Sequence, residues 1–134
     1  MDKLSKERRS ANMRAVKGRH TKPEMIVRRL THAMGYRFRL HRADLPGRPD
    51  LAFPSRRAVI EVRGCFWHGH DCPRGRLKPE ANAAFWAAKL SGNVARDACN
   101  LARLKAAGWR ALVLWECELG DAGRLASRIK RFLG

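Results

Sequence analysis

The sequence lacks the features that would indicate a membrane, secreted or multidomain protein. It has no apolar run near the roughly 20 residues that a membrane-spanning helix needs. Its charged start contains neither the apolar core nor the cleavage site of a secretory signal. It also has no internal repeat and no low-complexity linker, and 134 residues are too few for a second full domain. We therefore expect one globular domain in the cytoplasm, with no membrane association.

Acidic residues are scarce relative to basic ones. Against 29 Lys and Arg residues there are only 12 Asp and Glu residues, which gives a formal net charge of +17. Nucleic acids favour such a surface because their condensed counterions are released on binding. The charge therefore predicts a nucleic-acid partner. The alternative is a general bias toward basic residues from GC-rich coding, since charge alone says nothing about fold.

Residues 1–20 differ from the rest of the chain. This segment is basic and nearly devoid of large apolar side chains, so it has little with which to pack against a core. We expect an arm that becomes ordered on a DNA partner; a solvated tail is the alternative. The remaining residues, 21–134, form the single predicted domain.

The sequence pattern of this domain predicts a mixed sheet flanked by helices. The expected elements are a helix from Thr21 to Gly35, strands over 36–41, 50–53 and 57–63, helical segments over 80–90 and 93–108, a strand over 110–115 and a closing helix. The two middle helical segments are separated by a predicted break at Ser91-Gly92, with Asn93 as the new cap. The continuous apolar run at 110–115 is typical of a central strand covered on both faces.

Two charged residues interrupt an apolar strand on the same face. In the strand over 57–63, alternation places Glu61 and Arg63 together, and Asp50 precedes the neighbouring strand. Phosphodiester cleavage with Mg²⁺ needs carboxylate ligands and a cation held close together on a rigid scaffold. A Pro-Asp…Glu-x-Lys arrangement on adjacent strands supplies them, and here Arg stands in place of Lys.

Three potential soft ligands occur within eight residues, at Cys65, His70 and Cys72, and Cys117 follows the last predicted strand. Together they are suited to a tetrahedral Cys3His zinc site. The alternative is a pair of buried thiols beside surface histidines. Cys99 has no partner at zinc spacing, and we expect it in the core.

Aromatic and acidic residues occupy two further unusual positions. The pairs Phe66-Trp67 and Phe85-Trp86 lie near a loop rich in Gly, His and Arg, where large rings pack poorly into a core but can wedge between base pairs. Core packing is the alternative. Asp97 lies at the edge of a helical apolar stripe, and a carboxylate there needs a bonded partner.

Five longer motifs carry a resemblance to a known family: SANMRAVKGRHTKPE, LPGRPDLAF, GCFWHGHDCP, FWAAKLSGNVARD and GWRALVLWEC. Over residues 9–117 the chain resembles the very-short-patch repair (Vsr) DNA mismatch endonucleases. The resemblance implies a restriction-endonuclease-like, PD-(D/E)xK-type fold with a structural zinc. It also implies Mg²⁺-dependent nicking on the 5′ side of the thymine in T:G mismatches. Such mismatches arise when 5-methylcytosine deaminates, which implies coupling to a cytosine-5 DNA methyltransferase and to a MutL-like matchmaker protein.

The resemblance also implies roles for individual residues. Asp50 corresponds to the metal-binding aspartate, and the carbonyl of Val62 to a second Mg²⁺ ligand. His68 corresponds to the histidine that activates water, Asp97 to the carboxylate that supports it, and Glu24 to an acidic residue near the site.

The same correspondence covers the zinc site, the aromatic residues and the arm. The implied zinc ligands are Cys65, His70, Cys72 and Cys117. The implied intercalating residues are Phe66, Trp67 and Trp86, and the implied arm, which grips DNA from the minor-groove side, includes Asn12, Met13 and Arg14.

Three positions depart from the family. Well-known members carry histidine where this chain has Arg63, often threonine where it has Val62, and in some cases an apolar residue where it has Glu61. We expect Glu61 to act as a possible second carboxylate and Arg63 to neutralise charge on the phosphate.

Two other functions are compatible with the residues. One is a zinc-stabilised DNA-binding module without catalysis, in which Asp50 and Asp97 are structural. The other is a restriction-type endonuclease of the same fold that cuts paired DNA. A monomer suits an enzyme that cuts one strand of an asymmetric lesion.

Overall fold

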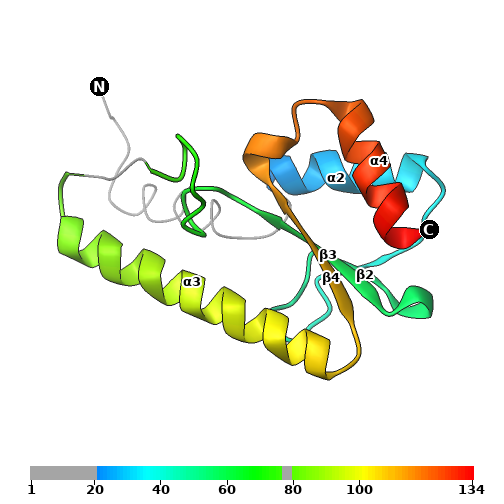
Figure 1. The fold of residues 1–134 in the computed structure, drawn as a ribbon, viewed down its shortest axis with the longest axis horizontal. Helices are drawn as coiled ribbons and strands as arrows, with labels where there is room; N and C mark the ends of the chain where they lie inside the picture. The colour runs from blue at the N-terminus through cyan, green and yellow to red at the C-terminus, as the bar shows by residue number, and fades with distance from the viewer. Residues whose placement is uncertain (1–20, 77–79) are drawn as a thin grey trace, which may run out of the picture.

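A computed structural model describes residues 21–76 and 80–134 of the chain. In this part, helices cover both faces of a four-stranded sheet (Figure 1). Helices α2 (Lys22–Ala33) and α4 (Ala122–Leu133) lie on one face, and the long helix α3 (Ala83–Ala106) lies on the other. The order of elements agrees with the predicted one. The expected arm, with Asn12, Met13 and Arg14, lies outside the described residues.

The sheet combines antiparallel and parallel pairing. Strands β1 (Arg39–Leu40), β2 (Leu51–Phe53) and β3 (Ala58–Arg63) are antiparallel neighbours, and β4 (Arg110–Trp115) runs parallel to β3. The 3-10 turn η1 (Pro54–Arg56) joins β2 to β3, and η2 (Glu116–Glu118) follows β4.

The prediction that the last strand is central was wrong. Within the described residues the strand order is β1-β2-β3-β4, so β4 lies at an edge of the sheet. The expected cover on both faces is also incomplete, because Leu114 is the one buried residue of β4. An apolar sequence does not report whether both edges of a strand are paired.

The start of α2 follows from its sequence. The Thr21 hydroxyl accepts a hydrogen bond from the Glu24 N–H at 3.3 Å, which satisfies one of the free donors at the helix start. Pro23 lies in the first turn, where its missing N–H costs nothing. This cap fixes the position of Glu24, whose side chain is only 2% exposed.

Alternation along β3 divides the core into two parts. Ala58 and Ile60 belong to the larger cluster, which includes residues of α2 and α4, and Val59 belongs to a smaller cluster with Leu104 of α3. Glu61 continues the second face, so its charge lies on the α3 side of the sheet, as the alternation predicts.

Helix α3 is continuous for 24 residues, and the predicted break at Ser91-Gly92 was wrong. A single glycine costs about 1 kcal/mol in a helix, which is too little to end one that packs against a sheet. Asn93 does not cap a new helix. Its side-chain amide donates to the Trp67 carbonyl at 2.9 Å and so connects α3 to the loop after β3.

The expected apolar stripe of α3 also differs. Val94 is 45% exposed and Cys99 is an exposed free thiol, so the expectation of Cys99 in the core was wrong. The buried residues of α3 are Leu90 and Leu104. Leu101 also packs against the smaller core cluster with Leu104, and the first turns of α3 extend past the sheet (Figure 1).

Among the helices of the described segments, none combines the length and the apolar character needed to cross a lipid bilayer.

Two glycines, Gly92 in α3 and Gly69 in the loop that faces it, should respond oppositely to substitution by alanine. A side chain at Gly92 meets open space, so Gly92→Ala should raise the free energy of unfolding by about 0.5–1 kcal/mol, measured by denaturant titration. Gly69→Ala should lower it, because Gly69 has φ +62 and its Cβ would lie 2.8 Å from Val94. A loss of stability in Gly92→Ala would contradict the continuous helix.

Candidate active site and zinc centre

One cleft of about 740 Å³ brings together the residues predicted for catalysis. It lies where the start of α2, the β2–β3 pair, the loop after β3 and α3 meet. Eight of the predicted site residues line it: Glu24, Asp50, Glu61, Val62, Arg63, Trp67, His68 and Asp97. The cleft is also lined by Lys89 and Arg96 of α3, which the sequence did not single out.

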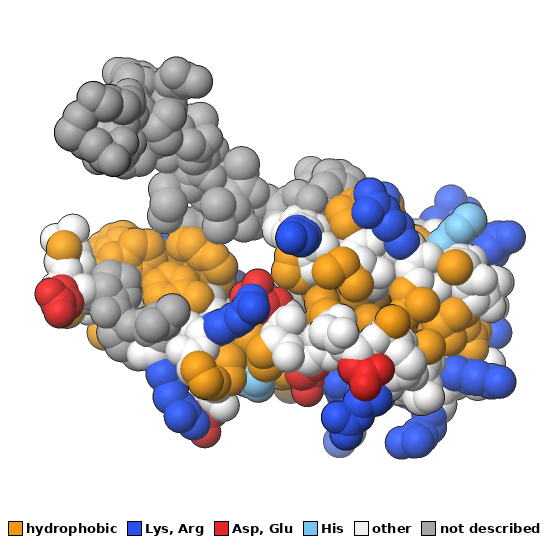
Figure 2. All heavy atoms as spheres, turned by 90° about the horizontal axis from the view of Figure 1, so that it is seen from above, with side chains coloured by type: hydrophobic (Ala, Val, Ile, Leu, Met, Phe, Trp, Pro, Cys, Tyr) orange, Lys and Arg blue, Asp and Glu red, His pale blue; other side chains and the backbone are white. Residues whose placement is uncertain are grey.

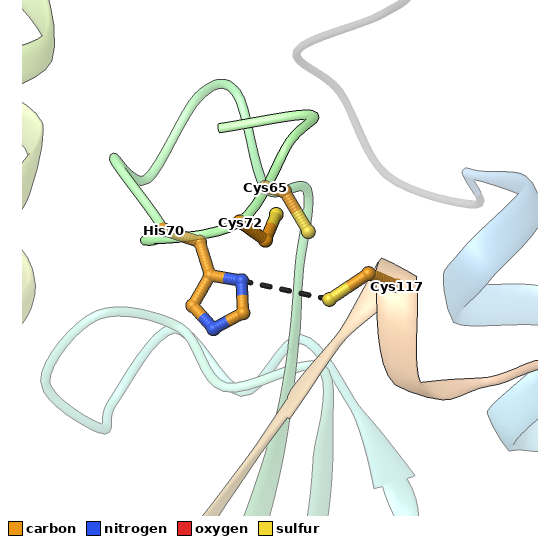
Figure 3. A group of neighbouring side chains, drawn as sticks. All are labelled: Cys65, His70, Cys72 and Cys117. Carbon is orange, nitrogen blue, oxygen red and sulfur yellow. Dashed lines mark hydrogen bonds between the residues drawn. The ribbon is translucent and has the colours of Figure 1, made fainter. Parts of the chain in front are cut away.

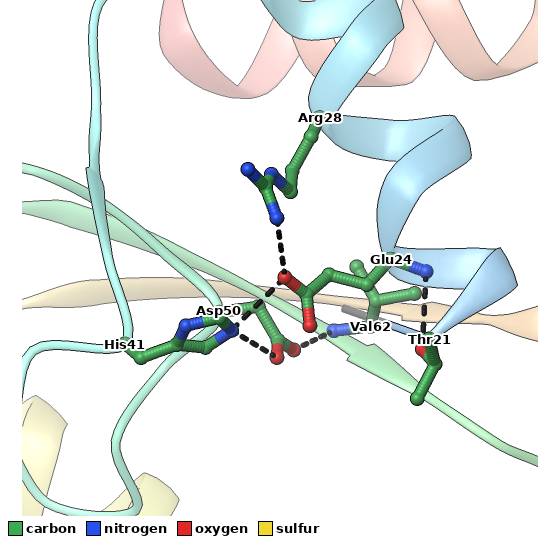
Figure 4. Close-up of polar contacts among 6 residues, drawn as sticks. All are labelled: Thr21, Glu24, Arg28, His41, Asp50 and Val62. Atoms are coloured by element: carbon green, nitrogen blue, oxygen red, sulfur yellow. Dashed lines mark hydrogen bonds and ion pairs between the residues drawn. The ribbon is translucent and has the colours of Figure 1, made fainter. Parts of the chain in front are cut away.

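Asp50 is held by the pairing of β2 with β3. It directly precedes β2, and its Oδ2 accepts a hydrogen bond from the Val62 N–H at 2.6 Å (Figure 4). Burial raises the pKa of Asp50 to about 7, against the lowering effect of the Val62 bond, and the nearby Glu24 and Glu61 carboxylates raise it further. The site therefore concentrates carboxylate oxygens where a cation would stabilise them.

His41 joins this acidic group, and the sequence reasoning missed it. Its Nε2 lies 2.9 Å from Oε2 of Glu24 and 3.8 Å from Oδ1 of Asp50. The same Glu24 oxygen lies 3.4 Å from Arg28 Nη1. Strands were expected over 36–41 and 50–53, but their pairing with each other was not predicted. In the structure this pairing places position 41 beside Asp50, and the His41 N–H donates to the Asp50 carbonyl.

His68 and Asp97 form the tightest side-chain pair of the cleft. Nδ1 of His68, in the loop after β3, lies 2.6 Å from Oδ2 of Asp97 in α3. The half-buried Asp97 carboxylate therefore has a bonded partner, as we expected from its position in the sequence. It also orients the imidazole and leaves Nε2 as the second ring nitrogen.

Arg63 is buried beside Glu61 and Trp115. The residue is only 7% exposed, its Nη2 lies 3.5 Å from Oε1 of Glu61, and its guanidinium lies 5.6 Å from the centre of the Trp115 ring. Nε and Nη2 of Arg63 and Oε2 of Glu61 have no hydrogen-bond partner among the described residues. Burial raises the pKa of Glu61, and the Arg63 charge opposes that effect. Buried donors without partners are costly unless a ligand satisfies them.

The predicted aromatic wedges gather into one cluster. Phe66, Trp67 and Trp86 have ring centres 5.1–5.7 Å apart, and Phe85 packs against Trp86 at 5.4 Å. Phe85 is 59% exposed, and Trp67 also lines the cleft. Figure 2 shows hydrophobic side chains gathered at the end of the molecule where α3 begins. The cluster is thus a surface feature, and only part of it is covered by protein.

The four predicted zinc ligands also meet. Cys65, His70 and Cys72 come from the loop after β3, and Cys117 comes from η2 at the end of β4 (Figure 3). Their ligand atoms all lie within 4.8 Å of one another, and Cys117 Sγ lies 3.5 Å from His70 Nδ1.

This donor set fits zinc. Ligands at 2.0–2.3 Å in a tetrahedral site lie about 3.5 Å apart, and three thiols with one imidazole are typical zinc ligands. Without metal the thiols differ strongly. Burial raises the pKa of Cys65 to about 12. At Cys72 burial also raises the pKa, but hydrogen bonds from the Gly75 N–H, His70 and Cys65 together outweigh it and lower the pKa to about 7. A cation bound to all four would remove this imbalance.

The loop around the cluster is tightly built. A side chain at Gly75 would place its Cβ 1.8 Å from the His70 carbonyl oxygen, so only glycine fits. The Cys65 N–H donates to Glu116 at 3.2 Å, and Arg74 pairs with the other oxygen of the same carboxylate. These contacts join the loop to the end of β4.

Comparisons with known proteins identify relatives of this chain. A family model described as DNA mismatch endonuclease Vsr matches residues 1–74. The type II nicking enzyme V.XorIIP of Xanthomonas oryzae pv. oryzae (strain KACC10331 / KXO85) is 52% identical over 98% of this chain and 96% of its own length. DNA mismatch endonuclease Vsr of Escherichia coli (strain K12) is 42% identical over 92% of this chain and 79% of its own.

A solved structure supports the fold. The catalytic domain of the homing endonuclease I-Bth0305I superposes with a TM-score of 0.59 and 21% sequence identity, over 84% of this chain and 93% of that domain. The predicted mixed sheet flanked by helices is thereby confirmed, and this catalytic domain shares it.

The cysteine cluster predicts the metal content of the purified protein. We expect about one zinc per chain by elemental analysis, and Cys117→Ser should lose most of it and several kcal/mol of stability. Cys99→Ser is the matched control, because Cys99 is exposed and outside the cluster, and it should leave both unchanged. A Cys117→Ser variant with full zinc and full stability would refute the site.

The buried carboxylate predicts a pH-dependent gain of stability on its removal. The pKa of Asp50, about 7 in the folded chain, exceeds its ordinary value of 3.8, so the folded state binds more protons between these pH values and loses stability as pH rises through that range. In Mg²⁺-free buffer Asp50→Asn should raise the free energy of unfolding by about 1–3 kcal/mol at pH 8, and by about half as much at pH 5.5. The exposed control Asp44→Asn should give no gain. An equal gain at both pH values would contradict this origin.

Proposed function

Since the chain belongs to the Vsr family of DNA mismatch endonucleases and is a DNA-nicking hydrolase, we propose that it uses Mg²⁺ to cut the strand 5′ to the thymine of a T:G mismatch. One observation carries this proposal. Asp50, the His68–Asp97 pair and the Trp67 ring line a single cleft, so cleavage groups and a base-stacking surface can act on the same DNA.

The residues around Asp50 fit a hard divalent cation. Buried carboxylate oxygens, with a pKa for Asp50 raised by burial and by its acidic neighbours, favour such an ion over an empty site. We assign Asp50 and the Val62 carbonyl as its ligands, with Glu61 as a possible second carboxylate and Glu24 in support. Bound Mg²⁺ would supply charge to the scissile phosphate and make a water more acidic.

His68 takes the proton from the attacking water. Its Nδ1 is engaged by Asp97 at 2.6 Å, so Nε2 is the nitrogen that receives the proton. Asp97 holds the ring in place and stabilises the imidazolium that forms. The close contact of the pair supports these roles, because a general base needs a fixed orientation.

Arg63 binds the phosphate on which charge develops. Its buried guanidinium has donors without protein partners among the described residues, and it lies along the same cleft. Glu61 and the Trp115 ring fix its position. An arginine suits this role because it stays charged and offers several donors in a planar array.

Phe66, Trp67 and Trp86 select the mismatch. Inserting aromatic rings costs a few kcal/mol of base unstacking, and a wobble pair opens more easily than a Watson–Crick pair. The partly exposed aromatic cluster beside the cleft supports this role.

Residues 1–20 would grip the duplex from the minor-groove side, with Asn12, Met13 and Arg14 in contact with DNA.

The biological setting follows from this substrate. T:G pairs form where 5-methylcytosine deaminates, so we propose that the enzyme acts on nucleoid DNA, in the sites of a cognate cytosine-5 methyltransferase. A MutL-like matchmaker protein is the proposed repair partner, and a monomer suits a cut in one strand.

An end-labelled duplex with one T:G pair tests the function. With Mg²⁺ the wild-type protein should nick only the thymine strand, and at least about tenfold faster than a perfectly paired duplex. Asp50→Ala and His68→Ala should each slow nicking by at least about 100-fold, whereas the exposed control Asp44→Ala should not.

Two outcomes would contradict the proposal. If wild-type protein leaves the mismatched duplex intact, the proposal that it nicks T:G mismatches is wrong. If it cuts both strands of paired DNA equally well, the chain is a restriction-type enzyme of the same fold.

A further inference from the structure

Glu24, His41 and Asp50 form a compact group. None of the five sequence motifs contains all three residues. Their candidate ligand atoms, two carboxylate oxygens and one imidazole nitrogen, all lie within 4.8 Å of one another (Figure 4). The side chains of Glu24 and His41 are 2% and 9% exposed. The group therefore combines oxygen and nitrogen donors in a largely buried setting.

The placement of His41 is imposed by the fold. Its backbone N–H donates to the Asp50 carbonyl at 3.2 Å, and it follows directly after β1. Its φ of 45° lies in the left-handed region, which a residue with a side chain adopts at a cost. In this position its ring points toward the two carboxylates rather than toward solvent.

We propose that His41 Nε2 is a nitrogen ligand of the cation assigned to Asp50, that the supporting Glu24 carboxylate also contacts this ion, and that His41 makes the site prefer Mn²⁺ over Mg²⁺. This inference rests on the proposed function, because it concerns the same cation. Neighbouring ligands of a six-coordinate ion lie about 3 Å apart and opposite ones about 4 Å apart. The distances of Nε2 from the Glu24 and Asp50 oxygens, 2.9 and 3.8 Å, span this range.

The chemical class of the metal follows from the donor set. Mg²⁺ prefers oxygen ligands and retains its water, whereas imidazole binds first-row transition metals. Among these, Mn²⁺ also accepts the carboxylate ligands that Mg²⁺ uses, so it is the one suited to a mixed site of this kind. A site with carboxylates alone would not distinguish these ions in this way. A histidine whose only role is to pair with Glu24 would contribute to folding and would leave metal preference unchanged.

Manganese binding to the full-length, zinc-loaded protein without DNA tests the proposal. Pulsed EPR of bound Mn²⁺ detects a directly coordinated nitrogen, and titration gives the affinities for Mn²⁺ and Mg²⁺. Wild-type protein should show the nitrogen signal, and His41→Gln should abolish it and weaken Mn²⁺ binding about tenfold, with less than about a threefold change for Mg²⁺. His32→Gln, at an exposed histidine of α2, is the matched control and should behave as wild type.

The proposal is overturned if the nitrogen signal is absent from wild-type protein, or persists in His41→Gln. It is also overturned if Mn²⁺ affinity is the same in both. Circular dichroism and zinc content show that each variant is folded, and His41→Asn replaces His41→Gln if it is not. Failure of the proposed function would appear separately, as absence of T:G nicking by wild-type protein that binds the metal normally.

Discussion

The loop after β3 is irregular, and its attachment determines whether this protein has a cleft at all. Residues 64–76 carry Trp67 and His68 but contain no helix or strand, so conformational entropy opposes any single placement of these side chains. Contacts with β4 and with α3 overcome it. Cys117 at the end of β4 closes the cysteine and histidine cluster over the loop, and Asn93 of α3 binds the Trp67 carbonyl. The loop is thereby tied to both the sheet and the long helix.

The sheet and the loop contribute different parts of the chemistry. Pairing of β2 with β3 positions Asp50 and the buried Glu61–Arg63 pair, and the loop brings His68 to the same cleft. Buried charges of this kind oppose folding unless they are paired or bound. The raised pKa of Asp50 reports that cost, which the hydrophobic cores on the two sheet faces offset. The arrangement is typical of a site selected for function over stability.

Sequence patterns failed where tertiary context outweighed local preference. Ser91-Gly92 looked like a helix break, but packing of α3 at both ends of that segment maintains the helix. Cys99 looked like a core residue, but helix periodicity identifies a face without showing whether another layer covers it. The apolar sequence of β4 likewise indicated covered faces and could not indicate its edge position.

The sequence by itself determined the order of elements, the cap at Thr21 and the face shared by Glu61 and Arg63. It also singled out the four side chains of the cysteine and histidine cluster. These features depend on residues that are close to one another in the sequence or on recognisable sequence motifs. Only the tertiary structure decided that His41 joins Glu24 and Asp50. It also decided that one ring, Trp115, contacts both the His70 imidazole and the guanidinium of Arg63. Such contacts join residues far apart in sequence, and they exist only after strand pairing and helix packing have brought those residues together.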